Sequence, residues 1–96
     1  MYRIYVSFDC VPGKREEFLK EVKSQGILDA IRSEDGCLCY DYYRSDEDEN
    51  KILLIEFWES KTHQEIHMGQ PHMEKLREIN SKCIKSAKLG EFEFKN

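Results

Sequence analysis

Three histidines within ten residues are the most concentrated source of acid–base chemistry in the sequence. They are His63, His67 and His72, and the chain contains no other histidine. His63 and His67 lie four positions apart, so on a helix their imidazoles share a face and could hold a metal ion or exchange protons near neutral pH. A zinc-protease helix needs glutamate directly after its first histidine, and that position is Gln64 here. We therefore expect proton transfer and no metal site.

The segment between His67 and His72 decides whether these two residues can act together. On a continuous helix their side chains would point about 140° apart. Gly69 and Pro71 interrupt the helical pattern between them, and such an interruption can reset the helical phase so that both imidazoles face one cavity. The alternative is that the histidines are surface or capping residues.

Two predicted strands supply a matching wall of aromatic side chains and one carboxylate. Tyr40 and Tyr42 share one face of the first strand, because side chains alternate along a strand. Leu54, Glu56 and Trp58 share one face of the next. A cavity with this wall suits a flat, weakly polar ligand with an ionisable hydroxyl group, and a buried Glu56 would need a hydrogen-bonding partner. The alternative is a packed core without a cavity.

The elements that must position these residues alternate between strand and helix patterns. Residues 2–9 alternate apolar and polar side chains, as a strand with one buried face does. Gly26 falls where the apolar face of the following helix shifts, so we expect that helix to break there. We predict strands at 2–9, 37–44, 51–58 and 91–95, a helical region from 14 to Gly36, a short helix from Ser60 to about Met68, and a longer helix through Ala87. This βαββαβ order, in a single domain of residues 1–96, predicts a ferredoxin-like α+β sandwich.

Further expectations concern how the strands pack. The strand at 51–58 is almost entirely apolar in its middle, so we expect it to be central and covered on both faces. In the strand at 37–44 we place Leu38 on the face shared by Tyr40 and Tyr42. The acidic stretch 45–50, SDEDEN, lacks the ligand spacing of an EF-hand, so we interpret it as a solvated hairpin turn.

Composition and charge exclude several classes of partner. The 96 residues carry a net charge of -4 and no basic block, so we expect no nucleic-acid partner. The longest aliphatic run, residues 52–55, is far shorter than the ~18 residues of a membrane span. We therefore expect a cytoplasmic protein with no membrane partner, whose four cysteines are reduced thiols. A domain this small with an exposed apolar face favours self-association, so we expect an oligomer.

One stretch closely resembles the quinol monooxygenase branch of the antibiotic biosynthesis monooxygenase (ABM) domain family. It is residues 55–73, IEFWESKTHQEIHMGQPHM, which share the frame IExWESxxHxExHxxxPHM. Residues 32–40 resemble the family's RxExGCLxY segment, so the resemblance covers nearly the whole chain. It implies a homodimeric α+β barrel in which the sheets of two subunits meet face to face.

The resemblance also implies an activity. In the quinol-oxidising members, oxygen is inserted into a small aromatic substrate from O2 without flavin, haem or metal, so we expect no cofactor. A deprotonated hydroquinone is electron-rich enough to reduce oxygen, so the protein need supply only a base and an enclosed pocket. In this hypothesis His67 deprotonates the phenol, His72 or Glu56 orients or polarises it, and the aromatic wall clamps the ring. The candidate residues are His67, His72 and Glu56 for catalysis, and Trp58, Tyr40, His63 and Tyr42 for substrate binding.

Two alternatives remain open on the sequence. Residues 66–72 also resemble the xIHxxxPH segment of an isomerase that processes a phosphorylated quorum-signal sugar. The cations that could contribute to a phosphate site are Arg32, Arg44 and Lys51. The other alternative is a non-catalytic ligand-binding dimer of the same fold, or a structural dimer whose cavity is filled by Tyr42, Met68 or Met73.

Overall fold

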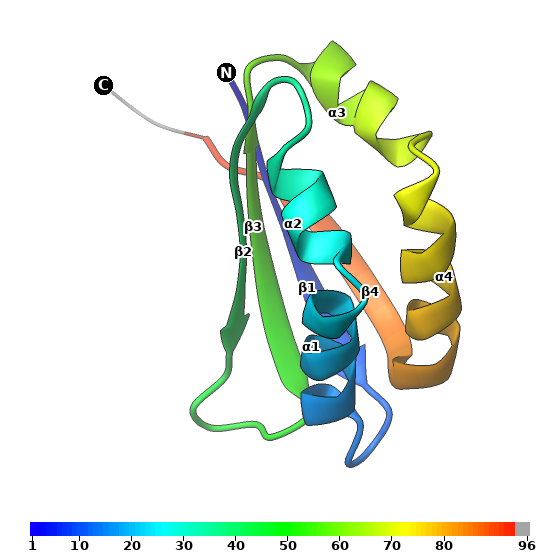
Figure 1. The fold of residues 1–96 in the computed structure, drawn as a ribbon. Coiled ribbons are helices and arrows are strands. Elements are labelled where there is room, and N and C mark those ends of the chain that lie inside the picture. Colours follow the sequence, from blue (N-terminus) through cyan, green and yellow to red (C-terminus); the bar gives the residue numbers. More distant parts are fainter. Residues whose placement is uncertain (94–96) are drawn as a thin grey trace.

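The chain forms one antiparallel sheet with all its described helices on one face. The computed structural model describes residues 1–93. In chain order the elements are β1 (Tyr2–Cys10), α1 (Arg15–Ser24), α2 (Ile27–Arg32), β2 (Cys37–Arg44), β3 (Lys51–Trp58), α3 (Lys61–Met68), α4 (His72–Cys83) and β4 (Ile84–Glu91). The sheet and the helices make two layers (Figure 1). The predicted βαββαβ order is confirmed, with each helical segment divided in two.

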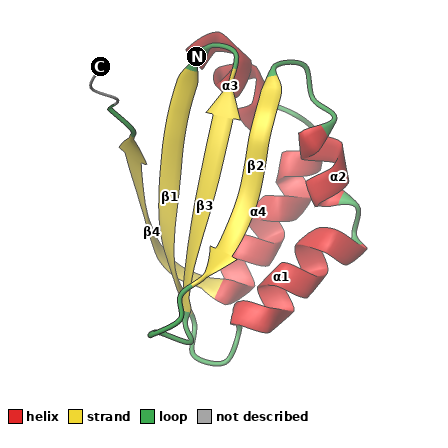
Figure 2. Cartoon of the chain, turned by 90° about the vertical axis from the view of Figure 1, so that its left-hand side faces the viewer, coloured by secondary structure: helices red, strands yellow, loops and turns green. Residues whose placement is uncertain are grey.

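The sheet has the strand order of a ferredoxin-like sandwich. Its strands lie in the order β2-β3-β1-β4, and each neighbouring pair is antiparallel. The predicted central position of β3 and the predicted α+β fold class are therefore confirmed. Figure 2 shows the four strands side by side in front of the helices, so the other face of the sheet is left open in the single chain.

Short breaks let the helices follow the sheet. Gly26, between α1 and α2, has a φ of 73°, a conformation that glycine adopts without strain, so the predicted break is confirmed. Val22 of α1 and Ile31 of α2 are both buried although they lie on different helical faces. Ser60 caps α3 by accepting a hydrogen bond from the His63 backbone N–H at 3.2 Å, as its position before the helix predicts.

The expectation that β3 is covered on both faces is wrong for the single chain. Its inner face is buried beneath the helices and consists of Ile52, Leu54, Glu56 and Trp58. Leu53, on the outer face, remains 37% exposed. Both faces of the middle of the strand carry large apolar side chains, but the helices cover only one face.

The placement of Leu38 beside the two tyrosines is also wrong. The register between β2 and β3 shifts between Cys37 and Cys39, so Leu38 is the extra residue of a β-bulge. A bulge breaks the alternation of side chains, and Leu38 is consequently exposed while Tyr40 is buried. The rule that every second residue of a strand shares a face therefore does not hold across such a shift.

The last helix is shorter than predicted and the last strand begins earlier. We expected the helix to run through Ala87 and a strand at 91–95, but α4 ends at Cys83 and β4 begins directly at Ile84. The segment from Ile84 pairs with the free edge of β1, where Phe8 lies opposite Ala87 and Ile4 opposite Glu91. The apolar residues at helical spacing extend beyond Cys83, so the pattern overestimated the length of the helix. Residues 94 and 95 of the expected strand lie outside the described residues.

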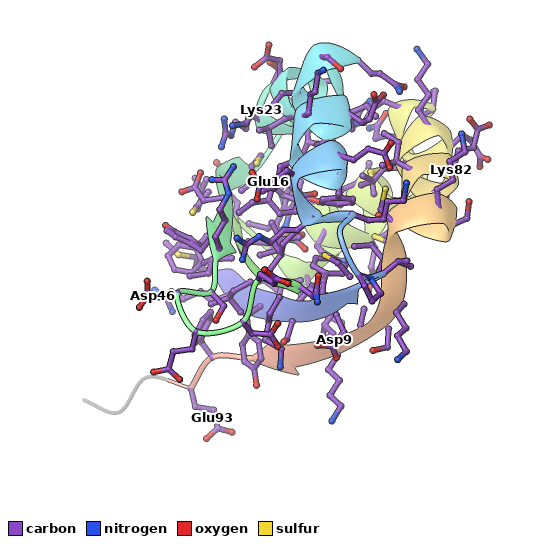
Figure 3. The ribbon with its side chains drawn as sticks, turned by 90° about the horizontal axis from the view of Figure 1, so that it is seen from below. Asp9, Glu16, Lys23, Asp46, Lys82 and Glu93 are labelled. Atoms are coloured by element: carbon purple, nitrogen blue, oxygen red, sulfur yellow. The ribbon has the colours of Figure 1, made fainter. Side chains whose placement is uncertain are left out.

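The remaining sequence expectations concern cysteines, membranes and charge. All four cysteines are free. Within residues 1–93, none of the helices has both the length and the apolar character needed to cross a bilayer. Charged side chains such as Asp46 and Lys82 project outward from the periphery (Figure 3).

Replacing Gly36 with alanine should destabilise the fold more than the same change at Gly13. Both glycines have a φ of 80°, so alanine costs about 1 kcal/mol of backbone strain at either position. A Cβ atom at Gly36 would in addition overlap the ring of His63, whereas no atom lies within 4 Å of one at Gly13. We expect a further loss of ~1–3 kcal/mol at Gly36 in urea unfolding. In a His63→Ala background, which removes the ring but keeps the nearby Cβ atom, this excess should become smaller. Equal losses at the two glycines would contradict the account.

Candidate active site

A cavity of about 290 Å³ lies between the sheet and the helices α3 and α4. Tyr40, Glu56 and His67 line one part of it, from β2, β3 and α3 respectively. The α4 residues that line it are Met73, Leu76 and Asn80. The floor is the inner face of β1 and β4, beside which α4 runs (Figure 1).

The cavity is open to solvent on the side of β4. Leu89 on the floor and Met68 on α3 both line it, and they are 58% and 44% exposed. The sequence left open whether Tyr42, Met68 or Met73 would fill this space. The two methionines line the cavity without closing it, and Tyr42 packs edge-on against Phe18 with ring centroids 5.5 Å apart.

His67 is held in place on three sides. Its side chain is 1% exposed, and its Nδ1 lies 2.7 Å from Oε2 of Glu34. The indole of Trp58 lies against the imidazole with a centroid distance of 4.7 Å and an interplanar angle of 34°. The ring of Tyr40 meets it edge-on at 5.6 Å. These contacts leave the imidazole a single orientation at the cavity wall.

Glu34 joins the second and third histidines. His72 Nε2 lies 2.8 Å from the same Oε2 atom that His67 contacts, and the Glu34 side chain is 6% exposed. The interruption at residues 69–71 thus brings both imidazoles to one carboxylate, but of the two only His67 is among the cavity-lining residues. Sequence reasoning assigned Glu34 no role. Its one signal was its place in the RxExGCLxY segment.

The Glu34 carboxylate fixes the proton of His67. Burial lowers the pKa of His67 below its ordinary value of 6.5, and the hydrogen bond and charge of Glu34 oppose this shift in part. His67 is therefore neutral near pH 7. Because a carboxylate only accepts, Nδ1–H donates to Glu34 and the lone pair lies on Nε2. The arrangement provides a neutral imidazole that can accept a proton.

Glu56 is a second titratable group in the cavity wall. Burial raises its pKa to about 7, and the negative charge of Glu34 adds to the rise. The hydrogen bond that Trp58 Nε1–H donates to Glu56 Oε1 at 3.0 Å opposes it. This indole is the partner that a buried Glu56 requires. Both protonation states of Glu56 are populated near neutral pH.

The structure places three of the predicted substrate-binding residues outside the cavity lining. Trp58 is fully buried behind His67. Tyr42 lies in the core beside Tyr40, with ring centroids 5.8 Å apart. His63 Nδ1 lies 2.6 Å from Ser60 Oγ, and its Nε2 lies 3.5 Å from Asp35. The α3 surface therefore directs His63 toward the turn before β2 and His67 toward Glu34.

Asn80 is a cavity residue that the sequence did not reveal. It lies on the apolar stripe of α4, four positions after Leu76 and three before Cys83. Its Oδ1 atom is buried and has no hydrogen-bond partner among residues 1–93. A polar residue on a buried helical stripe was the available signal.

Glu34, His67 and His72 are also the described residues that could hold a metal ion. Their ligand atoms all lie within 4.8 Å of one another. Two imidazoles and a carboxylate are a ligand set that zinc and non-haem iron use. The separations of 2.7 and 2.8 Å are those of direct hydrogen bonds, so an ion would have to replace both.

The cations considered for a phosphate site lie elsewhere. Arg32 pairs with Asp41 at 2.9 Å, and its Nε donates to the Tyr40 carbonyl oxygen. Arg44 pairs with Glu16 on α1 at 2.7 Å, and Lys51 pairs with Asp9 at 3.5 Å. Within residues 1–93 the cavity lining contains neither lysine nor arginine.

Comparison with protein families identifies one match over most of the chain. The family model described as "Antibiotic biosynthesis monooxygenase" matches residues 1–79. These residues include β1 to α3 and most of α4, and hence every residue of the Glu34, His67 and His72 cluster.

Two relatives are similar in sequence to about two thirds of the chain. "Uncharacterized protein sll1783" of Synechocystis sp. is 31% identical over 67 residues, or 70% of this chain and 44% of that protein. "Putative monooxygenase YcnE" of Bacillus subtilis is 32% identical over 63 residues, or 66% of this chain and 64% of that protein. The chain thus matches less than two thirds of the length of either relative.

Solved structures share the fold along the whole chain. The crystal structure of PA3566 from Pseudomonas aeruginosa has a TM-score of 0.85 and 21% identity, and covers 99% of this chain and 94% of that one. A crystal structure titled as an antibiotic biosynthesis monooxygenase also has a TM-score of 0.85, with 20% identity and complete coverage of both chains. At these identities the likeness concerns the fold.

Replacing Glu56 with glutamine should remove a pH-dependent cost of burying its carboxyl group. Between pH 4.5 and about 7 the unfolded chain has lost the Glu56 proton while the folded chain retains it. This group therefore makes wild-type stability fall as pH rises through that interval and level off above it, by about 3 kcal/mol in total. Glutamine still accepts the Trp58 hydrogen bond, so the variant should match wild type below this interval and exceed it above. Urea unfolding across this pH range tests this, and a pH-independent difference would contradict it.

Proposed function

This chain belongs to the antibiotic biosynthesis monooxygenase family, and from that premise we propose that it oxidises a small quinol or similar aromatic compound with O2. The observation that supports this most strongly is His67, a neutral imidazole oriented by Glu34 at the wall of a cavity of about 290 Å³. A general base must be neutral, fixed in direction and able to reach its substrate. A cavity of this size accommodates one or two aromatic rings.

In the proposed reaction the substrate supplies the electrons. His67 Nε2 takes the phenolic proton, and the quinolate passes one electron to O2. The two radicals join at an unsubstituted ring carbon, and a carbon–oxygen bond forms. Loss of the ring proton and cleavage of the oxygen–oxygen bond release one oxygen atom as water, so quinol and O2 give hydroxyquinone and H2O. The protein's part is to remove the proton and to enclose the reacting pair.

Glu34 and His72 would stabilise His67 after it has accepted the proton. The imidazolium formed at His67 has the Glu34 carboxylate 2.7 Å from its Nδ1. His72 donates to the same oxygen and holds the carboxylate in line with His67. Glu56 faces the cavity with a pKa of about 7, so in its protonated form it can donate a hydrogen bond to a substrate oxygen.

The open face of the sheet supports the proposal of a homodimer. Tyr43 and Leu53 lie opposite each other on this face and are 49% and 37% exposed. Phe57 lies on the same face of β3, and its ring meets that of Phe92 at 6.4 Å. An apolar sheet face of this kind buries itself against a second copy at little cost. The four free thiols fit the proposed cytoplasmic location.

Replacing His67 with alanine should lower the rate of quinol-dependent oxygen consumption by about 10²–10⁴-fold, because the general base is lost. The assay uses protein treated with a chelator, a small naphthoquinol, and a blank without protein for spontaneous oxidation. Glu65→Gln, an exposed change on the same helix, is the matched control and should retain the wild-type rate.

A second variant distinguishes a base from a structural residue. Glu34→Gln removes the charge that raises the His67 pKa, so the acid side of the pH–rate profile should move to lower pH. Equal rates in wild type and His67→Ala would remove His67 from the mechanism. Tight binding of quinol without oxygen consumption would identify a ligand-binding protein of the same fold.

Replacing Leu53 with lysine should convert the proposed dimer to a monomer, because it places a charge at the centre of the open sheet face. Light scattering after size exclusion measures the mass directly. Ile66→Lys is the matched control, since Ile66 is also exposed, at 58%, but lies on α3 in the helical layer. A wild-type chain that is monomeric at all concentrations would contradict the proposal.

A further inference from the structure

The wall of the cavity contains a carboxyl group but no permanent positive charge. Among residues 1–93, the side chains that line it and can ionise near neutral pH are Glu56 and His67. His67 is neutral near pH 7 and its Nδ1 is held by Glu34. The negative charge of Glu34 raises the pKa of Glu56, so the field of Glu34 also reaches this part of the wall. The wall is therefore neutral or negative, and it offers an anion no counter-charge.

The cations around the cavity are already paired. Arg77 contacts a residue at the opening, since its Nη2 donates to the Met68 carbonyl oxygen at 2.6 Å, but its Nη1 pairs with Glu74 at 2.9 Å. The three cations considered above for a phosphate site are each paired with a carboxylate and lie outside the lining. A ligand anion would have to compete with an existing carboxylate for any of these four residues.

The opening of the cavity is apolar. Leu89 and Met68 both line the cavity and are 58% and 44% exposed, and Ala87 lines it on the same strand as Leu89. A ligand group that lies against these side chains loses part of its hydration and gains no polar partner from them. A charged substituent is therefore poorly accommodated at the opening as well as at the wall.

We infer that the cavity selects uncharged aromatic substrates, and that Glu56 in its wall and Leu89 at its opening determine this selection. The inference rests on the proposed function, in which His67 takes a phenolic proton. A neutral quinol becomes a quinolate only as His67 becomes an imidazolium, so the total charge enclosed in the cavity does not change during this step. A substrate that carries a carboxylate or a phosphate brings a charge that has no partner there, and burying an unpaired charge is strongly unfavourable.

The experiment is a binding titration without oxygen, which prevents both turnover and spontaneous oxidation. The probes are 1,4-dihydroxy-2-naphthoate and the corresponding carboxamide, which share their rings, their hydroxyl groups and the outline of the substituent but differ in charge. The titration is made at about pH 8, where the probe carboxylate is ionised and Glu56, with a pKa of about 7, is mostly ionised. We expect wild type to bind the carboxamide at least about 10-fold more tightly than the carboxylate.

Two variants test the residues that determine the selection. Leu89→Arg places a cation at the opening and should tighten binding of the carboxylate, relative to the carboxamide, on the order of 10-fold. Ile66→Arg is the matched control, because Ile66 is also 58% exposed but does not line the cavity, and it should keep the wild-type preference. Glu56→Gln removes the charge from the wall while still accepting the Trp58 hydrogen bond, and it should reduce the preference for the carboxamide by roughly threefold or more.

The outcomes separate this inference from the proposed function. Equal binding of the two probes by wild type overturns the inference even where His67-dependent oxygen consumption is present, and so does an equal change of preference in Leu89→Arg and Ile66→Arg. If Leu89→Arg binds neither probe, Glu56→Gln decides, and an unchanged preference in that variant overturns the inference. A wild-type preference for the carboxamide without oxygen consumption refutes the proposed function and leaves a cavity that selects uncharged ligands. If neither probe binds to wild type and no oxygen is consumed, both fail.

Discussion

The carboxylate of Glu34 is the group on which the arrangement of the site depends. It follows α2, yet a single one of its oxygens accepts hydrogen bonds from His67 on α3 and His72 on α4, at 2.7 and 2.8 Å. It therefore ties three separate segments together across the break between the last two helices. The same contact selects the tautomer of His67 and counters part of the effect of burial on its pKa. Glu34 thus fixes the direction and tautomer of the imidazole, while burial keeps the ring neutral.

The cavity exists because the helical layer covers the sheet unevenly. Val22 and Ile31 of the first helical segment are fully buried, whereas Leu89 on the inner face of the edge strand β4 is 58% exposed. The uncovered strip lies between that strand and the last two helices, and its lining includes the polar side chains of Glu56, His67 and Asn80. A fully packed layer would have no room for a ligand. The apolar packing given up in this strip is what leaves the cavity open.

Local structure could be predicted well from the sequence. Contacts and strand pairing between distant segments could be predicted less well. The alternating pattern of the strands and the break at Gly26 could be predicted because both arise from residues close together in the chain. The start of β4 at Ile84 could not, because it depends on pairing with the free edge of β1. Glu56 and His67 were identified from their types and spacing. Glu34 was missed as a partner because it lies 33 positions from His67 in the sequence and carries no local sign of that contact.

The alternation of side chains along β3 places the cavity wall on one side of the sheet and the open face on the other. Glu56 faces the helices and the cavity, while its neighbour Phe57 and the nearby Leu53 face the open side. A second copy docked on the open face would therefore touch the same strand that carries the titratable carboxyl group without entering the cavity. Substitutions on the open face and in the cavity wall can therefore be made independently, because consecutive residues of β3 point to opposite sides of the sheet.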